Sequence, residues 1–354
     1  MNNKFFAQTL IRWYQHQHRD LPWRHTRDPY KIWLSEVILQ QTRIAQGLPY
    51  YERFVKHYPA VLDLASANEQ DIIRLWQGLG YYSRARNLHQ TAQFVAQELK
   101  GNFPITYAGL LQLKGIGPYT AAAIASFAFE ETVAVVDGNV YRVLARVFGI
   151  ETDIGSTQGK KQFAQLAAEL ISNDQPAIYN QAIMEFGAVL CKPTSPDCLL
   201  CPLQEVCIAN ATGRINQLPV KSKKIKVKER FFNYFVIVQG ELLAMQQRTE
   251  RDIWQKLYEF YLVESDKHIS TLDELPDYHE LHFLLAHATV TVPSRVYTHI
   301  LTHQRIQAQF WQVQIPSHIQ LALPENLTFL SPQEIEQVPK PVLISSYWEA
   351  NFFE

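Results

Sequence analysis

The 354-residue sequence lacks several features that define whole classes of protein. It contains no apolar run approaching the roughly 20 residues of a membrane span, and its polar, amphipathic beginning lacks the apolar core of a signal peptide. Charged residues make up 19% and hydrophobic residues 47%, a balance unlike that of disordered or fibrous chains. No tandem repeat at a fixed period is apparent. We therefore expect an intracellular globular protein, and its length favours two or three domains.

Net charge is also nearly absent, at −1, but the two parts of the chain differ in sign. Residues 1–230 contain 26 Lys and Arg against 19 Asp and Glu, whereas residues 231–354 contain 7 against 15. A basic N-terminal part suits a polyanion such as DNA, and it equally suits an ordinary surface. The asymmetry indicates that the two parts face different partners.

Residues 1–214 carry the apolar spacing of many short helices, and residues 231–354 do not. Segments such as NEQDIIRLWQGLG, with Asn68 as N-cap, place apolar side chains at i, i+3, i+4 and i+7. Residues 215–230 include five lysines between positions 221 and 228 and are predicted to form a basic linker. From residue 231, alternating stretches such as RIQAQFWQVQI predict strands with few helices between them. The sequence therefore predicts an all-α domain followed by an α+β domain.

Cysteine is scarce, and all four copies lie in one short segment. Cys191, Cys198, Cys201 and Cys207 have the spacing C-x6-C-x2-C-x5-C. Disulfides are disfavoured in a reducing compartment. Structural zinc usually pairs two C-x2-C knuckles, whereas a [4Fe–4S] cluster accepts four thiolates from one compact loop. The spacing favours a structural iron–sulfur cluster and leaves zinc as the competitor.

The segment LKGIGPYTA, residues 113–121, superficially fits the glycine pattern of a dinucleotide-binding loop. Such a loop needs a preceding strand, but YAGLLQL reads as a short helix, so this function is disfavoured. Gly115 and Gly117 instead suit a helix–hairpin–helix, whose backbone N–H groups approach a DNA phosphate. Pro118 suits the first helical position, and Tyr119 follows at the exposed start of that helix. A tight turn that only joins two helices remains the alternative.

Two carboxylates are candidates for acid–base chemistry. Glu36 lies in the apolar stretch IWLSEVILQQT, where burial would raise its pKa toward that of a general acid near neutral pH. A solvated glutamate on an outer helix face is the alternative. Asp137 ends the apolar stretch VAVVD just before a helix, where it can serve as an N-cap and also act in the chemistry.

The combination of LKGIGPYTA, VDGNV and the cysteine spacing resembles the endonuclease III superfamily of helix–hairpin–helix DNA glycosylases. Within it, LPWR, WLSEVILQQT, GLGYYSRARNL and YNQAIMEFGAVLC are similar to the adenine DNA glycosylase branch, the MutY type. The resemblance is dense over residues 20–210, and the motifs occur in the family's order. It implies a helical glycosylase domain over residues 1–214 with a [4Fe–4S] loop at residues 191–207.

The same resemblance implies a monofunctional enzyme that flips out adenine mispaired with 8-oxoguanine or guanine and hydrolyses its N-glycosidic bond. Glu36 would protonate the leaving adenine and then help to activate water, while Asp137 would stabilise the cationic sugar. Asn139 matches an asparagine of the catalytic pocket. Tyr119 stands where the lyase branch has its Schiff-base lysine, and Lys114 lies on the other side of the hairpin.

Double-stranded DNA containing these mispairs is the implied partner. Gln41 and Tyr81 match positions inserted into the duplex at the lesion. Trp23 and Arg24 fall at the entry to the adenine pocket, and Gln181 matches a position that contacts adenine in relatives.

Residues 231–354 resemble the family's Nudix-like domain, which recognises 8-oxoguanine. WQKLYEFYLVE fits a strand segment of that domain, and because no acidic Nudix motif is present, nucleotide hydrolysis is not expected. Leu301, Thr302 and His303 stand where relatives have Phe-Ser-His. Thr302 keeps a hydroxyl that can bond to the lesion, whereas Leu301 departs from the aromatic residue. His303 either contacts DNA or faces solvent on a hairpin.

Two other functions stay open at this point. A bifunctional endonuclease III-like glycosylase/AP lyase is disfavoured by Tyr119. A non-enzymatic iron–sulfur DNA-binding protein would leave Glu36 and Asp137 dispensable. We expect a monomer, with a clamp or mismatch-repair protein as a plausible partner, in the cytoplasm at the nucleoid if the source is bacterial.

Overall fold

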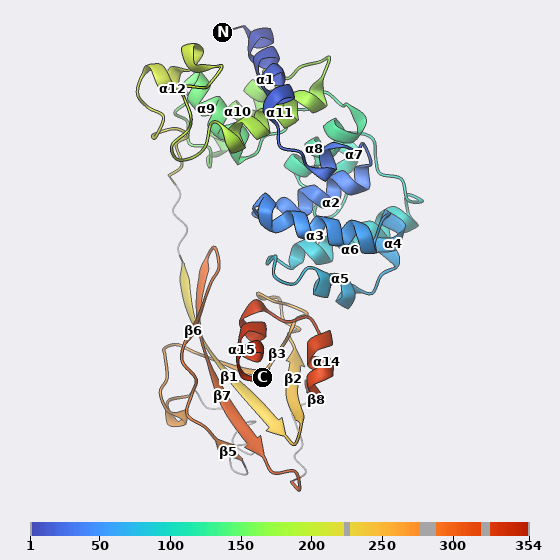
Figure 1. The fold of residues 1–354 in the computed structure, drawn as a ribbon, viewed down its shortest axis with the longest axis vertical. Helices are drawn as coiled ribbons and strands as arrows, with labels where there is room; N and C mark the ends of the chain where they lie inside the picture. Colours follow the sequence, from blue (N-terminus) through green and yellow to red (C-terminus); the bar gives the residue numbers. More distant parts are fainter. Residues whose placement is uncertain (1, 223–226, 276–287, 320–325, 353–354) are drawn as a thin grey trace. The chain divides into compact units, whose positions relative to one another are not determined.

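The computed structural model describes residues 2–222, 227–275, 288–319 and 326–352 (Figure 1). The chain forms two compact units, which we call the helical unit and the sheet unit. The helical unit comprises Met1–Ser66 and Asn87–Lys223, and the sheet unit comprises Ala67–Arg86 and Lys224–Glu354. Across the described residues, no helix is both long and apolar enough to cross a membrane.

The helical unit consists of helices and loops, and no strand occurs in residues 2–222. Helix α6 begins within the residues assigned to the sheet unit and continues into the helical unit. Two 3-10 turns, Pro22–Arg24 and Gln204–Val206, complete the unit. The α-helices are α1 (Asn3–Gln17), α2 (Pro29–Leu39), α3 (Ile44–His57), α4 (Val61–Ser66), α6 (Ser83–Gln97), α7 (Tyr107–Leu110), α8 (Pro118–Phe129), α9 (Gly138–Phe148), α10 (Thr157–Leu170), α11 (Pro176–Val189) and α12 (Ile208–Ala211).

Side-chain caps and prolines fix the starts of the helices that carry the predicted motifs. Asp28 caps α2 by accepting from the Tyr30 N–H, and Pro29 takes the first helical position. Pro118 takes that position in α8. Helices α1, α9, α10 and α11 bury a common core, so α9 and α11 are held side by side. The predicted all-α fold of this part of the chain is confirmed.

Across the described residues of the sheet unit, eight strands form one mixed sheet. Its long central pair, β1 and β7, runs parallel, and the other pairings are antiparallel. The order is β3-β2-β1-β7-β5, while β4 pairs with β1, β6 with β7 and β8 with β2. The strands are β1 (Lys228–Gln239), β2 (Leu242–Gln247), β3 (Tyr258–Glu259), β4 (Tyr261–Ser265), β5 (Thr289–Val290), β6 (Tyr297–Ile300), β7 (Gln304–Ile315) and β8 (Leu327–Leu330).

Aromatic residues cover both faces of the sheet because successive side chains of a strand alternate. On one face Tyr234 of β1 stacks on Phe310 of β7, with ring centroids 5.2 Å apart. Tyr347 of α15 (Val342–Phe352) stacks on Phe310 at 3.7 Å, so this helix covers the face. On the other face Phe235 stacks on Trp311 at 6.2 Å. The predicted α+β fold is confirmed, with α14 (Pro332–Gln337) and the 3-10 turn Leu272–Glu274 as further helical elements.

Residues 67–86 pack with the sheet unit although they lie in the helical part of the sequence. They form α5 (Glu69–Leu75), capped by Asn68 as predicted, then a turn and the first residues of α6. Gln77 donates to the Ser345 hydroxyl at 3.0 Å, and Arg86 donates to the Gln255 carbonyl at 2.9 Å. Glu69 and Lys256 form an ion pair. These polar contacts fix the segment on the sheet unit.

The segment predicted as a linker, residues 215–230, has ordered structure at both ends. Ile215 and Leu218 pack on the core of the helical unit. Strand β1 begins at Lys228. Residues 223–226 lie outside the described residues, so the predicted domain boundaries stay a prediction.

Candidate active site

Glu36 lies on α2 and is only 6% exposed, so this carboxyl is not on a solvated helix face. Its Oε2 accepts a hydrogen bond of 2.5 Å from the Tyr119 hydroxyl. Burial raises the pKa of Glu36 to about 7, although the bond from Tyr119 and the nearby Arg24 lower it. The charge of Asp137 raises the pKa as well. Glu36 can therefore hold a proton near neutral pH and release it.

Tyr119 is half-buried in the first turn of α8 rather than fully exposed at its start. The start of α8 is exposed at Gly117 and Pro118, as expected, but the Tyr119 hydroxyl turns toward Glu36 of α2. Burial raises the pKa of Tyr119 well above 10. Tyr119 therefore stays protonated and donates to the carboxyl.

Asp137 is the N-cap of α9, as predicted from the sequence. Its Oδ1 accepts from the backbone N–H groups of Asn139 and Val140 at 2.9 and 2.8 Å. Its Oδ2 accepts from the Asn139 side-chain amide at 2.7 Å. Burial raises the pKa of Asp137 above its ordinary value, and these donors and Arg142 offset only part of that rise. Asp137 accepts three N–H donors and Glu36 accepts one phenolic donor, so hydrogen bonding stabilises the ionised form more at Asp137 than at Glu36.

Arg142 connects this carboxylate to the cysteine loop, and sequence reasoning missed it. Its Nη2 donates to Asn139 Oδ1 at 2.7 Å and to the Gly187 carbonyl at 2.6 Å, and its Nε donates to the Cys191 carbonyl at 2.7 Å. The guanidinium thereby orients the amide that donates to Asp137. Nothing in the sequence YRVLAR marks Arg142 as buried, because arginine on an amphipathic helix usually faces solvent.

A cavity opens beside Glu36, and four of the predicted site residues line it. These are Trp23, Arg24, Glu36 and Gln181, and the cavity is completed by Ile32, Ser35, Phe127 and Met184. Gln181 accepts a hydrogen bond of 2.6 Å from Tyr14 at its Oε1, which orients its amide. The cavity thus combines apolar walls, an amide and one carboxyl with a raised pKa.

Glu185 of α11 binds Arg19 and Arg24, and so holds the segment that carries Trp23 and Arg24 in place. The sequence did not predict this residue. It is 1% exposed and accepts from Arg24 Nη2 at 2.6 Å and from Arg19 Nη2 at 2.5 Å. Burial alone would raise the pKa of Glu185, but the hydrogen bonds from both arginines lower it to about 2. The ion pairs fix Arg24 at the wall of the cavity.

The four cysteines line one cavity together with Arg146. Arg146 is 2% exposed, and its Nη1 lies 3.4 Å from Cys191 Sγ and 2.7 Å from the Lys192 carbonyl. Burial raises the pKa of the Cys201 thiol to about 11. Within the described ranges, no three His, Cys, Asp or Glu side chains are grouped to hold a single metal ion. The structure thus gathers the four thiols around one cavity beside a buried cation.

The hairpin at residues 113–118 has the geometry of a helix–hairpin–helix and follows the short helix α7, not a strand. Gly115 has φ +74°, and a Cβ there would come within 2.9 Å of the Asn87 Cβ. Around Gly117 there is open space, and it precedes α8 without a side-chain cap. The first N–H groups of α8 are therefore accessible to an anion.

Gln41 and Tyr81, predicted to enter the duplex, share an unusual backbone conformation. Their φ angles are +55° and +48°, in the left-handed region that residues other than glycine rarely adopt. Gln41 is exposed, and Tyr81 is 40% exposed while its neighbour Tyr82 is buried. Such strain often accompanies functional positions.

The turn that contains Thr302 and His303 joins β6 to β7, and both residues are exposed. Leu301 N–H donates to the Gln304 carbonyl at 2.8 Å, which closes the turn. The hydroxyls of Thr302 and Tyr81 are hydrogen-bonded to each other. A cavity of the sheet unit is lined by this turn, by residues 78–83 and by Trp254. Tyr81 and Thr302, two predicted site residues that are far apart in the sequence, therefore line the same cavity.

Comparison with known proteins defines the class to which this geometry belongs. Residues 34–172 match the model of the HhH-GPD superfamily base excision DNA repair proteins, and residues 233–350 match the NUDIX domain. The chain is a DNA glycosylase of base excision repair with a C-terminal Nudix domain.

Comparison with individual relatives identifies the family of DNA glycosylases to which the chain belongs. The adenine DNA glycosylase of Buchnera aphidicola subsp. Baizongia pistaciae is 36% identical over 266 residues, 73% of this chain and 74% of that protein. The adenine DNA glycosylase of Rattus norvegicus is 44% identical over 226 residues, 60% of this chain and 44% of that protein. The structure of a thermostable thymine-DNA glycosylase is 30% identical, with a TM-score of 0.55, and covers 59% of this chain and 97% of that chain. The chain belongs to the adenine DNA glycosylase family, which confirms the resemblance read from the sequence.

Proposed function

We propose that this glycosylase excises adenine that is mispaired with 8-oxoguanine or guanine. The observation that carries the proposal is the contact between Glu36 and Tyr119 beside the cavity that Trp23, Arg24 and Gln181 line. A buried carboxyl with a pKa of about 7 suits protonation of a leaving base. The target base must leave the duplex to reach it.

The proposed reaction uses the two carboxyls in different protonation states. Glu36 transfers its proton to a ring nitrogen of adenine. The bond between N9 of the base and C1′ of the sugar then breaks, and the electron pair of this bond leaves with the base. The sugar then carries positive charge, which ionised Asp137 stabilises. Glu36, now ionised, accepts a proton from the water that attacks C1′, and the product is an abasic site.

We propose that the enzyme is monofunctional. At the start of α8 the chain offers the Tyr119 hydroxyl, which is bonded to Glu36, and no amine. The Lys114 ammonium is bonded to Gln90 Oε1 at 2.6 Å on the other side of the hairpin. Schiff-base chemistry needs a free amine at the sugar, so a lyase step is disfavoured. Borohydride trapping of a covalent adduct with DNA would contradict this assignment.

The duplex is proposed to be held at several points. The glycine turn at Gly115 and Gly117 presents the N–H groups of α8 to a phosphate. Gln41 enters the duplex at the lesion. In the sheet unit, Tyr81 and the turn at Thr302 and His303 read the base opposite adenine, with the Thr302 hydroxyl as a hydrogen-bonding group.

We further propose that Cys191, Cys198, Cys201 and Cys207 hold a structural [4Fe–4S] cluster. Four thiols around one cavity supply its ligand set, and the buried guanidinium of Arg146 compensates the negative charge of the thiolates. Bound there, the cluster would fold a loop that has little core of its own. Analysis of iron and sulfide, together with the visible absorption of the purified protein, tests this, and stoichiometric zinc would contradict it.

The test of the function is release of adenine from duplexes that contain adenine opposite 8-oxoguanine, guanine or thymine. We expect rapid release opposite 8-oxoguanine, slower release opposite guanine and little opposite thymine. Glu36→Gln should abolish release and retain binding to the duplex. Glu52→Gln, on the exposed surface of α3, is the matched control and should leave release intact. Turnover retained by Glu36→Gln would overturn the proposed role.

A further inference from the structure

The turn 248–257 joins β2 to β3 in the sheet unit and contains two strained residues. Trp254 has φ +61° and Lys256 has φ +68°. A bulky side chain in the left-handed region costs free energy, so such a conformation persists only where neighbouring groups enforce it. The contacts of this turn with its neighbours therefore determine its conformation.

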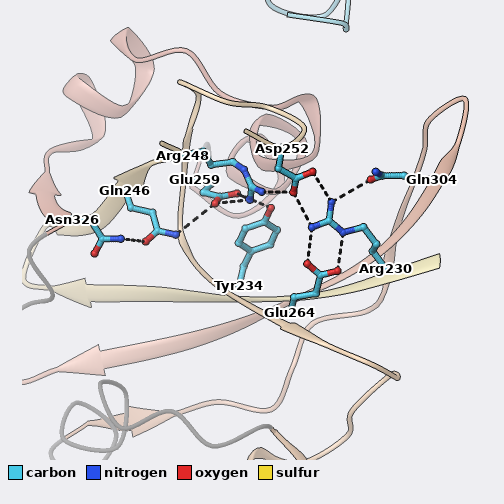
Figure 2. Close-up of polar contacts among 9 residues, drawn as sticks. All are labelled: Arg230, Tyr234, Gln246, Arg248, Asp252, Glu259, Glu264, Gln304 and Asn326. Carbon is cyan, nitrogen blue, oxygen red and sulfur yellow. Dashed lines mark hydrogen bonds and ion pairs between the residues drawn. The ribbon is translucent and has the colours of Figure 1, made fainter. Parts of the chain in front are cut away.

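Asp252 of this turn is held between two arginines (Figure 2). Arg230 of β1 donates to Asp252 Oδ1 at 3.0 Å, and its Nη2 lies 2.8 Å from Oδ2. Arg248 donates to Oδ2 at 2.9 Å from the start of the turn. Both arginine side chains are 10% exposed, so solvent screens these ion pairs little.

Each arginine is in turn fixed to the sheet by a second carboxylate (Figure 2). Arg230 makes two bonds to Glu264 of β4, at 2.7 and 2.6 Å. Arg248 makes two bonds to Glu259 of β3, at 2.8 and 3.0 Å. Among these three carboxylates Asp252 lies on the turn, and the other two lie on strands. The network therefore anchors the turn to the sheet at two points, through the pair of Asp252 with Arg230 of β1 and through the pair of Arg248 with Glu259 of β3.

The anchored turn supports the segment that carries Thr302. The Trp254 ring is 8% exposed and packs edge-on against His299, with ring centroids 5.4 Å apart. His299 lies near the end of β6, three residues before Thr302. Asp252 and Trp254 also line the cavity that Tyr81 and Thr302 share.

We propose that Asp252 is a positioning residue for recognition of the base opposite adenine, acting by holding Trp254 against His299. This inference rests on the proposed function and extends it to residues outside the turn that carries Thr302 and His303. The ligand is a purine oxidised at C8, which differs from guanine by an added carbonyl oxygen and N–H group. Discrimination between the two depends on the placement of a few hydrogen-bonding groups, so a displaced Thr302 hydroxyl should impair it.

Asp252→Asn is the first test, because asparagine preserves the size of the side chain and removes its charge. The two guanidiniums then face a neutral amide, and the strained turn loses its ion pair with Arg230 of β1 while Arg248 stays paired with Glu259. Single-turnover release of adenine is measured opposite 8-oxoguanine and opposite guanine, together with the midpoint of thermal unfolding. We expect the rate opposite 8-oxoguanine to fall about tenfold more than the rate opposite guanine, the loss expected for one misaligned hydrogen bond.

Glu264→Gln is the matched control, because it removes a carboxylate from the same arginine but lies on β4. It should change both rates by the same factor. Trp254→Leu is the second variant, because it keeps an apolar side chain and loses the edge contact with His299. It should reduce the ratio of the two rates as Asp252→Asn does, and it tests the proposal even if Asp252→Asn fails to fold.

The outcomes separate this inference from the function on which it rests. A wild-type protein that discriminates, with the ratio unchanged in both Asp252→Asn and Trp254→Leu, overturns the positioning role alone. Equal loss of both rates that follows the loss of stability also overturns it, since that is the result of a merely structural role. A wild-type protein that releases no adenine from either duplex overturns the proposed function and this inference together.

Discussion

Replacing Glu36 by glutamine should stabilise the protein at alkaline pH while it removes catalysis. The pKa of Glu36 is raised from 4.5 to about 7 by burial, so ionising it costs more in the folded state than in the unfolded state. Each pKa unit corresponds to about 1.4 kcal/mol, which gives a cost of about 3 kcal/mol once the carboxyl is fully ionised. Glutamine avoids this cost, and its carbonyl oxygen can still accept the hydrogen bond from Tyr119.

The sign of the pH dependence follows from the raised pKa. Below pH 4.5 the carboxyl is protonated in both states, so wild type and variant should be nearly equal. As pH rises from 4.5 to about 7, the wild type loses stability that the variant keeps. We expect Glu36→Gln to be more stable by about 3 kcal/mol at pH 8 and by less than about 1 kcal/mol at pH 5.

The assay is thermal unfolding of both proteins at pH 5 and pH 8. For a unit of this size, about 3 kcal/mol corresponds to a rise in the midpoint of roughly 6–12 °C. Glu52→Gln, which removes an exposed carboxylate, should show no comparable difference between the two pH values. Equal midpoints of wild type and Glu36→Gln at pH 8 would refute the claim that burial raises the pKa of Glu36.

Three further predictions concern the groups around Glu36. In Tyr119→Phe the pKa of Glu36 should rise further, because the hydrogen bond that the variant loses lowers this pKa in the wild type. Adenine release should then persist to higher pH. A pH midpoint of release that is unchanged or lower than that of the wild type would contradict this. Arg142→Lys keeps the charge but loses the fork between Asn139 and the Cys191 carbonyl, so single-turnover release should slow at least about tenfold, and wild-type rates would reject the coupling. Glu185→Gln leaves two arginines short of a carboxylate and should lower the free energy of unfolding by about 3 kcal/mol at pH 7. Because the pKa of Glu185 is depressed to about 2, this difference should shrink as pH falls from 4.5 toward 2, and denaturation curves at pH 7 and pH 3 check it.

The sequence predicted those site residues whose neighbours in the chain reveal their environment. Apolar residues on both sides of Glu36 indicate burial, and an apolar stretch followed by a helix indicates an N-cap at Asp137. The absence of a strand before Gly115 was sufficient to reject the dinucleotide-binding loop. The order of the motifs predicted the family.

The remaining features depend on contacts between distant parts of the chain. The hydroxyl of Tyr119 reaches Glu36 across 83 positions of sequence, so its burial could not be predicted from the start of α8 alone. Arg142 and Glu185 were missed because buried charged residues carry no local sign of their partners. The same holds for Asp252, because nothing next to it in the sequence points to Arg230, which lies 22 positions earlier.

The pH profile of adenine release tests the central claim most directly. Single-turnover release from a duplex with adenine opposite 8-oxoguanine should be measured from pH 5 to pH 9, for the wild type and for Glu36→Gln. We predict that the wild-type rate falls as pH rises through about 7, where Glu36 loses its proton, and that the variant shows no measurable release. A wild-type rate that is constant across this range, or release by the variant that matches the wild type, would contradict the account.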